Sequence, residues 1–160
     1  MRDAVSETDG GEDMDKVWVL VADGARARIL GSEGRVGRSL TELDDLVHPE
    51  TRLHEADLSD DRPGRSWGHG GEGRHAMDDP THPHDKERDT FAREIAARLL
   101  RALDDNAYQH LVVVAPSGFL GRLRAHFDAR VSARVSAEVN ADIVRERPDA
   151  IRTRLPDFLY

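Results

Sequence analysis

Histidine is concentrated in one stretch of this 160-residue chain, where aspartates accompany it. Neutral imidazole and carboxylate groups bind zinc, nickel or copper, so a metal site is one interpretation. His82 and His84 flank a single proline and would share a face of an extended backbone. A second pair at a matching spacing is absent, so we interpret the stretch as solvated and expect no metal or other cofactor. The weak ligand candidates are His69, His75, His82 and His84; the stretch also holds His48, His54, Asp78, Asp79 and Asp85.

The run from Arg62 to His84 contains glycine, histidine, proline and charged residues without apolar periodicity. It is excluded from a core, and a connection this long is usually either functional or disordered. Guanidinium groups hold phosphate and an exposed indole stacks on a base, so the run indicates contact with RNA. In the alternative interpretation, the indole of Trp67 packs back on the fold. The RNA-binding candidates are Arg62, Arg65, Trp67 and Arg74, with His69 beside them.

Later arginines offer an extension of this basic surface, at positions 122, 124, 130 and 134. Arg122 and Arg124 are two positions apart in a predicted helix, so their side chains point in different directions.

Ser117 follows a buried apolar run and precedes a helical pattern, as a nucleophile or a phosphate-binding turn would. The glycine and lysine patterns of those sites are missing, so Ser117 is predicted to be a helix N-cap. No catalytic residue is predicted.

The composition describes one acidic domain. Acidic residues outnumber basic ones by 31 to 23, a net charge of -8, so any contact with nucleic acid must be a local basic patch. The absence of cysteine fits a reducing compartment, and we expect a cytoplasmic protein. Residues 1–15 are acidic and lack an apolar run, which predicts a disordered tail and neither a signal peptide nor a membrane anchor. Residues 16–160 form the domain, with a long loop at about 48–84.

The first half reads as a three-stranded meander. Val17–Ala22 is a continuous apolar run, typical of a strand buried on both faces. Asp23-Gly24 predicts a tight hairpin turn with positive φ, and Ala25–Leu30 the returning strand. Gly31–Gly34 predicts a second turn, followed by a third strand over Ser39–Val47.

The second half alternates helices with strands. Asp85–Asp105 carries apolar residues at helical spacing, and Leu111–Ala115 is a second fully buried strand. A helix over Phe119–Arg130, a strand over Val135–Val139 and a short helix over Pro148–Leu155 follow. Together the two halves predict a mixed α/β sheet of five strands.

Three blocks of sequence resemble the bacterial host attachment protein family. They are Trp18–Leu30, then Val47–Glu50 with Asp60–Ser66, then Val113–Arg124. That family is similar to the middle domain of archaeo-eukaryotic peptide-chain release factors. The resemblance implies a ribonuclease-H-like sheet of order 3-2-1-4-5, with strand 2 antiparallel and helices flanking the sheet.

The resemblance also places the long loop at the functional tip of release factors, where Gly-Gly-Gln promotes ester hydrolysis. This chain has Gly70, Gly71 and Glu72 there. The two glycines retain the backbone freedom of the tip, but an ionised Glu72 cannot donate a hydrogen bond as glutamine does.

Three functional hypotheses follow. The first is a non-catalytic or degenerate release-factor-like protein that binds the ribosome or structured RNA through the loop. The second is a factor that supports attachment to a host indirectly, from the cytoplasm and without membrane insertion. The third is a metal-dependent hydrolase that uses the loop histidines. The sequence indicates no oligomeric state.

Overall fold

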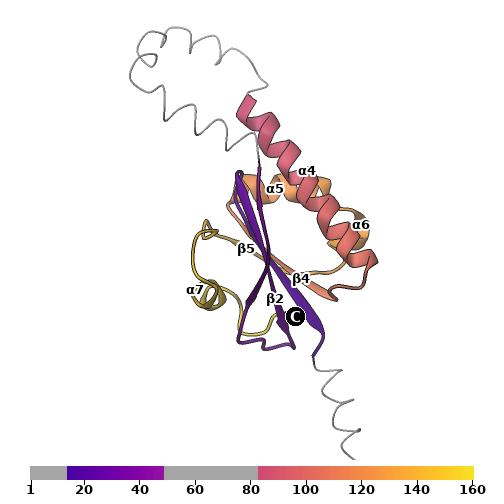
Figure 1. Ribbon diagram of the computed structural model, residues 1–160, viewed down its shortest axis with the longest axis vertical. Helices are drawn as coiled ribbons and strands as arrows, with labels where there is room; N and C mark the ends of the chain where they lie inside the picture. Colours follow the sequence, from indigo (N-terminus) through magenta and orange to yellow (C-terminus); the bar gives the residue numbers. More distant parts are fainter. Residues whose placement is uncertain (1–13, 49–82) are drawn as a thin grey trace, which may run out of the picture.

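A computed structural model describes residues 14–48 and 83–160 (Figure 1). Its five strands form a single sheet of order β3-β2-β1-β4-β5, as predicted. β2 pairs antiparallel with β1 and β3, whereas β4 pairs parallel with β1 and β5. The strands are β1 Lys16–Ala22, β2 Arg26–Glu33, β3 Thr41–Val47, β4 His110–Ala115 and β5 Val135–Asn140.

Helices cover both faces of the sheet. α4, α5 and α6 lie against one face, and α7 lies against the other (Figure 1). Among the described residues, no helix has both the length and the apolar character needed to cross a membrane. The helices are α4 Pro83–Asp104, α5 Ser117–His126, α6 Ala129–Ser132 and α7 Pro148–Thr153.

β1 and β4 are central because their apolar side chains fill both faces. Alternate residues of the two strands belong to two separate cores, one under α4 and α5 and one under α7. On the first face, Leu20 and Val113 pack beneath Phe91, Ile95 and Leu99 of α4. The continuous apolar runs of the sequence therefore correspond to strands buried on two sides, as predicted.

The first hairpin turn differs from the prediction. Gly24 has no positive φ; of the described residues, only Gly34 (86°) and Asn106 (60°) have one. The Asp23 carboxylate accepts hydrogen bonds from the main-chain N–H groups of Ala25 and Arg26, both at 2.9 Å, and this bonding shapes the turn. Glycine suits position 24 for another reason, because a Cβ there would lie 2.7 Å from Nε of Arg88.

The predicted turn at Gly31–Gly34 is also wrong. β2 continues to Glu33 because Ser32 and Glu33 pair with Val17 and Lys16 of β1. The chain turns only at Gly34, whose N–H donates to the main-chain oxygen of Asp15 at 2.9 Å. Residues 1–13 of the predicted tail lie outside the described residues, whereas Asp15 is fixed against the sheet and also contacts Nε2 of His110 at 3.1 Å.

The predicted helix over 119–130 is two helices. α5 begins at Ser117, and its N-cap is Pro116 without a side-chain hydrogen bond, so the predicted cap role of Ser117 is wrong. Asp128 separates α5 from α6 because its carboxylate accepts from the N–H of Arg130 at 2.8 Å and caps α6.

Tyr108 gives a test of the core under α4. Its side chain is 1% exposed, and its hydroxyl donates to the main-chain oxygen of Leu99 at 2.8 Å. Burial raises the pKa of Tyr108 to about 12, so the folded state loses stability as pH rises from about 10 to about 12. Tyr108→Phe should cost about 1 kcal/mol of unfolding free energy at pH 7 and weaken this alkaline loss. Urea unfolding at pH 7 to 11 measures both, and equal pH dependence of the two proteins would contradict the assignment.

Candidate functional site

Most of the predicted site residues lie outside the described part of the chain. His84 lies in the first turn of α4. The others are Arg62, Arg65, Trp67, His69, Gly70, Gly71, Glu72, Arg74, His75 and His82, which belong to the segment 49–82. The structure does describe the residues to which both ends of this segment are joined, and these define the candidate site.

His48 fixes the end of β3. Its main-chain N–H donates to the oxygen of Ala25 in the first hairpin turn at 3.1 Å. Its ring is buried, with 3% of the residue exposed, and stacks on Phe91 with 5.3 Å between centroids and 5° between planes. Phe91 belongs to α4, so this one stack connects the residue before segment 49–82 to the helix that follows it.

The stack continues into α5. Phe91 contacts Phe119, with 6.2 Å between ring centroids. Both phenylalanines are at most 5% exposed. We call His48, Phe91, Phe119 and the hairpin residue Ala25 the loop base. The loop base joins the end of β3, the β1–β2 turn, α4 and α5 into one packed unit, so the residue before segment 49–82 and the helix after it are held together.

Charged side chains surround the loop base on α4 and α5. Arg122 of α5 reaches Asp85 at 3.3 Å and Asp89 at 3.7 Å, both on α4. Asp89 also contacts Nε2 of His126 at 3.0 Å and Arg93 at 3.5 Å. The hydrogen bond from His126 lowers the pKa of the Asp89 carboxyl, with smaller contributions from the two arginines. This network cross-links the two helices by charge.

The proposed extension of a basic surface over α5 and α6 is wrong. Arg124 forms a two-pronged ion pair with Glu138 of β5, with a shortest distance of 2.6 Å. Arg130 pairs with Asp104 at 3.0 Å and with Asp128 at 3.3 Å. Carboxylates that lie 2 to 26 positions away in the sequence therefore pair with these arginines. Arg134 instead donates to the main-chain oxygen of Gln109 at 3.4 Å.

The described region contains no metal-ligand cluster, and Ser117 has no histidine partner there. Within residues 14–48 and 83–160, no three histidine or carboxylate side chains are grouped as metal ligands would be. Ser117 lies at the start of α5 in an exposed position, and the structure gives it no hydrogen bond to a histidine. The described region thus provides a scaffold with charged surroundings and no group of metal ligands.

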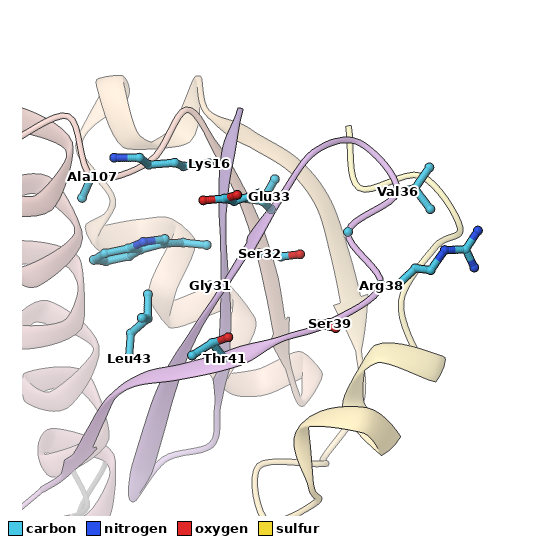
Figure 2. Close-up of a pocket in the computed structure, with 13 residues that line it drawn as sticks. Lys16, Gly31, Ser32, Glu33, Val36, Arg38, Ser39, Thr41, Leu43 and Ala107 are labelled. Atoms are coloured by element: carbon cyan, nitrogen blue, oxygen red, sulfur yellow. The ribbon is translucent and has the colours of Figure 1, made fainter. Parts of the chain in front are cut away.

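A groove at the opposite end of the sheet was not predicted. It has a volume of about 710 Å³ and lies where β3 separates from β2 (Figure 2). Trp18 lines the groove and is stacked on Tyr108 with 5.0 Å between ring centroids. The guanidinium carbon of Arg98 lies 5.4 Å from the centroid of the Trp18 ring. Leu43 is 50% exposed at the side of the groove and lies beside Gly31. A Cβ added to Gly31 would lie 2.8 Å from Cδ1 of Leu43. A sequence signal existed in Gly31, since glycine inside a strand often marks a close contact.

The fold is a mixed α/β sheet, and the connection between β3 and α4 begins at the loop base. The profile of the family described as "Protein required for attachment to host cells" matches residues 18–155, and the chain belongs to this family. No curated protein matches the chain significantly.

Two solved archaeal structures match the chain at low identity. One is described as an archaeal protein, with 11% identity and a TM-score of 0.48; the match covers 94% of this chain and 36% of that one. The other is an archaeal translation termination factor, with 10% identity and a TM-score of 0.48, covering 98% and 39% respectively. This chain therefore spans less than two fifths of the length of either protein.

Proposed function

We propose that this protein binds the ribosome or a structured RNA without catalysing a reaction, and that segment 49–82 makes the contact. The observation that carries the proposal is the loop base, in which the stack of His48 on Phe91 holds both attachment points of the segment. A fixed base reduces the conformational entropy that a long connection loses on binding.

Charge supports the same assignment. This support is local: segment 49–82 as a whole has four arginines against eight carboxylates, a net charge of -4 (4 − 8), but its residues 62–76 have Arg62, Arg65 and Arg74 against Glu72, a net charge of +2 (3 − 1). Most arginines of the described region are already paired with carboxylates, as Arg124 is with Glu138. A local basic stretch beside Trp67 is the composition that binds phosphate and stacks on bases.

Co-sedimentation with ribosomes tests the proposal. The test compares the intact protein with a linker variant, in which an equally long glycine-serine linker replaces residues 62–82. This replacement leaves α4 unchanged. We expect the intact protein to pellet with ribosomes or with their RNA and the linker variant to stay in the supernatant. If the intact protein fails to associate with ribosomes from growing and stationary cells and with ribosomal RNA, the proposal is wrong.

A second candidate function comes from the family description. The family is described as required for attachment to host cells, and in this alternative proposal the protein supports attachment indirectly, from the cytoplasm. Fractionation of the source cells separates this role from that of an adhesin, because an adhesin would be recovered in the outer surface fraction. If cells that carry the linker variant lose attachment, the segment proposed to bind RNA is also needed for attachment.

A further inference from the structure

The chain after α7 runs beside the β2–β3 connection, at the end of the sheet away from the loop base. The N–H of Leu159 donates to the main-chain oxygen of Arg35 at 2.7 Å, and Nε of Arg35 donates to the main-chain oxygen of Tyr160 at 2.7 Å. Ser136 of β5 donates to the oxygen of Leu159 at 2.6 Å. These bonds fix the segment after α7 in place.

Arg152 fixes the other side of the same region. Its guanidinium donates to the main-chain oxygens of Val36 and Gly37, both at 2.6 Å. It also donates to the oxygens of Pro156 at 3.0 Å and Asp157 at 3.1 Å. One side chain thus holds the β2–β3 connection against the segment after α7, so a site between them is organised in advance.

A pocket of about 500 Å³ lies between these two segments. Its walls include two apolar side chains that are unusually exposed for their size, Phe158 at 57% and Val36 at 39%. The volume lies within the usual range of about 300–1,000 Å³ for small-ligand sites. The lining residues are Val36, Arg38, Arg152, Thr153, Leu155, Asp157 and Phe158.

The charge around the pocket favours an anionic ligand. Arg35 lies 4.8 Å over the ring of Phe158 and donates to the oxygen of Tyr160 at the end of the chain, and Arg152 donates to four main-chain oxygens, so Arg38 is the lining guanidinium that is available to a ligand. Arg38 has neither a hydrogen bond nor an ion pair with any described residue. Figure 2 shows Val36 and Arg38 projecting toward the C-terminal segment, away from Lys16 and Leu43. Asp157 is the single carboxylate among the lining residues.

We propose that this pocket binds one unstacked base of a single-stranded RNA. The base would stack on Phe158, whose other face the Arg35 guanidinium covers, and its phosphate would bind Arg38. Base stacking on an exposed aromatic ring with arginine nearby is the usual mode of sequence-tolerant binding to single strands. The inference rests on the proposed function and adds a second contact at the opposite end of the sheet from segment 49–82.

Fluorescence anisotropy with labelled five-nucleotide uridine and adenosine oligoribonucleotides tests the pocket in the full-length protein. Phe158→Ala should weaken binding about 10-fold or more, and Phe158→Tyr should retain it. Arg38→Gln should weaken binding and reduce the slope of log K against log salt by about 0.7, as expected for one phosphate of a single strand.

Two matched controls keep the test specific. Leu43→Ala removes an equally exposed apolar side chain, and Arg145→Gln removes an exposed arginine that has no ion pair in the described region; neither residue lines the pocket. Both variants should bind like the unchanged protein. The inference is wrong if Phe158→Ala binds RNA with unchanged affinity, as it would if Phe158 contacted a protein instead. It is also wrong if the two control variants lose as much affinity as Phe158→Ala. Ribosome co-sedimentation of the linker variant decides the role of segment 49–82 separately.

Discussion

Replacing Phe91 by alanine is expected to lower the free energy of unfolding by about 3–5 kcal/mol. Phe91 is 1% exposed and stacks on both His48 and Phe119, so its removal opens a cavity at the loop base. For a domain of this size the loss corresponds to a fall in melting temperature of about 10 °C. Urea unfolding followed by circular dichroism measures the free energy, and calorimetry measures the melting temperature.

Phe158→Ala is the matched control for this change. It removes the same side chain from a position that is 57% exposed, so we expect a change of less than about 0.5 kcal/mol. If Phe91→Ala costs less than about 1 kcal/mol, the loop base is not a packed unit. In that event the link between the residue before segment 49–82 and the helix after it would have no structural support.

The second large effect is electrostatic. Changing Arg62, Arg65 and Arg74 together to alanine should reduce the slope of log K against log salt for RNA binding by about 2, at about 0.7 per phosphate of a single strand. With a slope change of 2, the affinity ratio of the unchanged protein to the triple variant is about 100-fold larger at 0.1 M salt than at 1 M salt. Filter binding or anisotropy across a salt series measures both quantities.

A charge-matched control uses arginines of the described region. Arg26, Arg124 and Arg130 are exposed but lie in ion pairs at 3.1, 2.6 and 3.0 Å, so they are less available to phosphate. Their joint change to alanine alters the net charge by the same amount and should leave the salt slope nearly unchanged. Equal losses in the two triple variants would show that net charge, and not the segment 49–82, determines binding.

The buried strands were accessible from the sequence because burial leaves a strong pattern, whereas the strand order was implied by the family resemblance. Val17–Ala22 and Leu111–Ala115 are apolar at every position and proved to be the two central strands. Local turn signals were less informative. The glycines at 31 and 34 predicted a turn, but pairing of Glu33 with Lys16 extends β2 through the first of them. Pairing between strands is a long-range interaction that local patterns do not contain.

The surroundings of the candidate site were harder to predict than the fold. Arg122 and Arg124 suggested a basic surface, yet their partners Asp85 and Glu138 lie 37 and 14 positions away in the chain. The pocket beside Phe158 depends on Arg152, which joins two segments separated by 115 positions. Contacts at these separations depend on the complete fold, so the sequence showed the residue types without their pairing.

The outer strand β3 has a consequence for self-association. It is an edge of the described sheet and carries Glu42, Asp44 and Asp45, with an irregularity in its pairing opposite Ile29 and Leu30. These carboxylates pair with Arg28, Arg98 and Arg26, so a second chain that added its own β3 there would have to disturb the ion pairs, and the irregular edge would disturb the hydrogen-bond ladder. The charged and irregular edge therefore protects the protein against aggregation through its sheet.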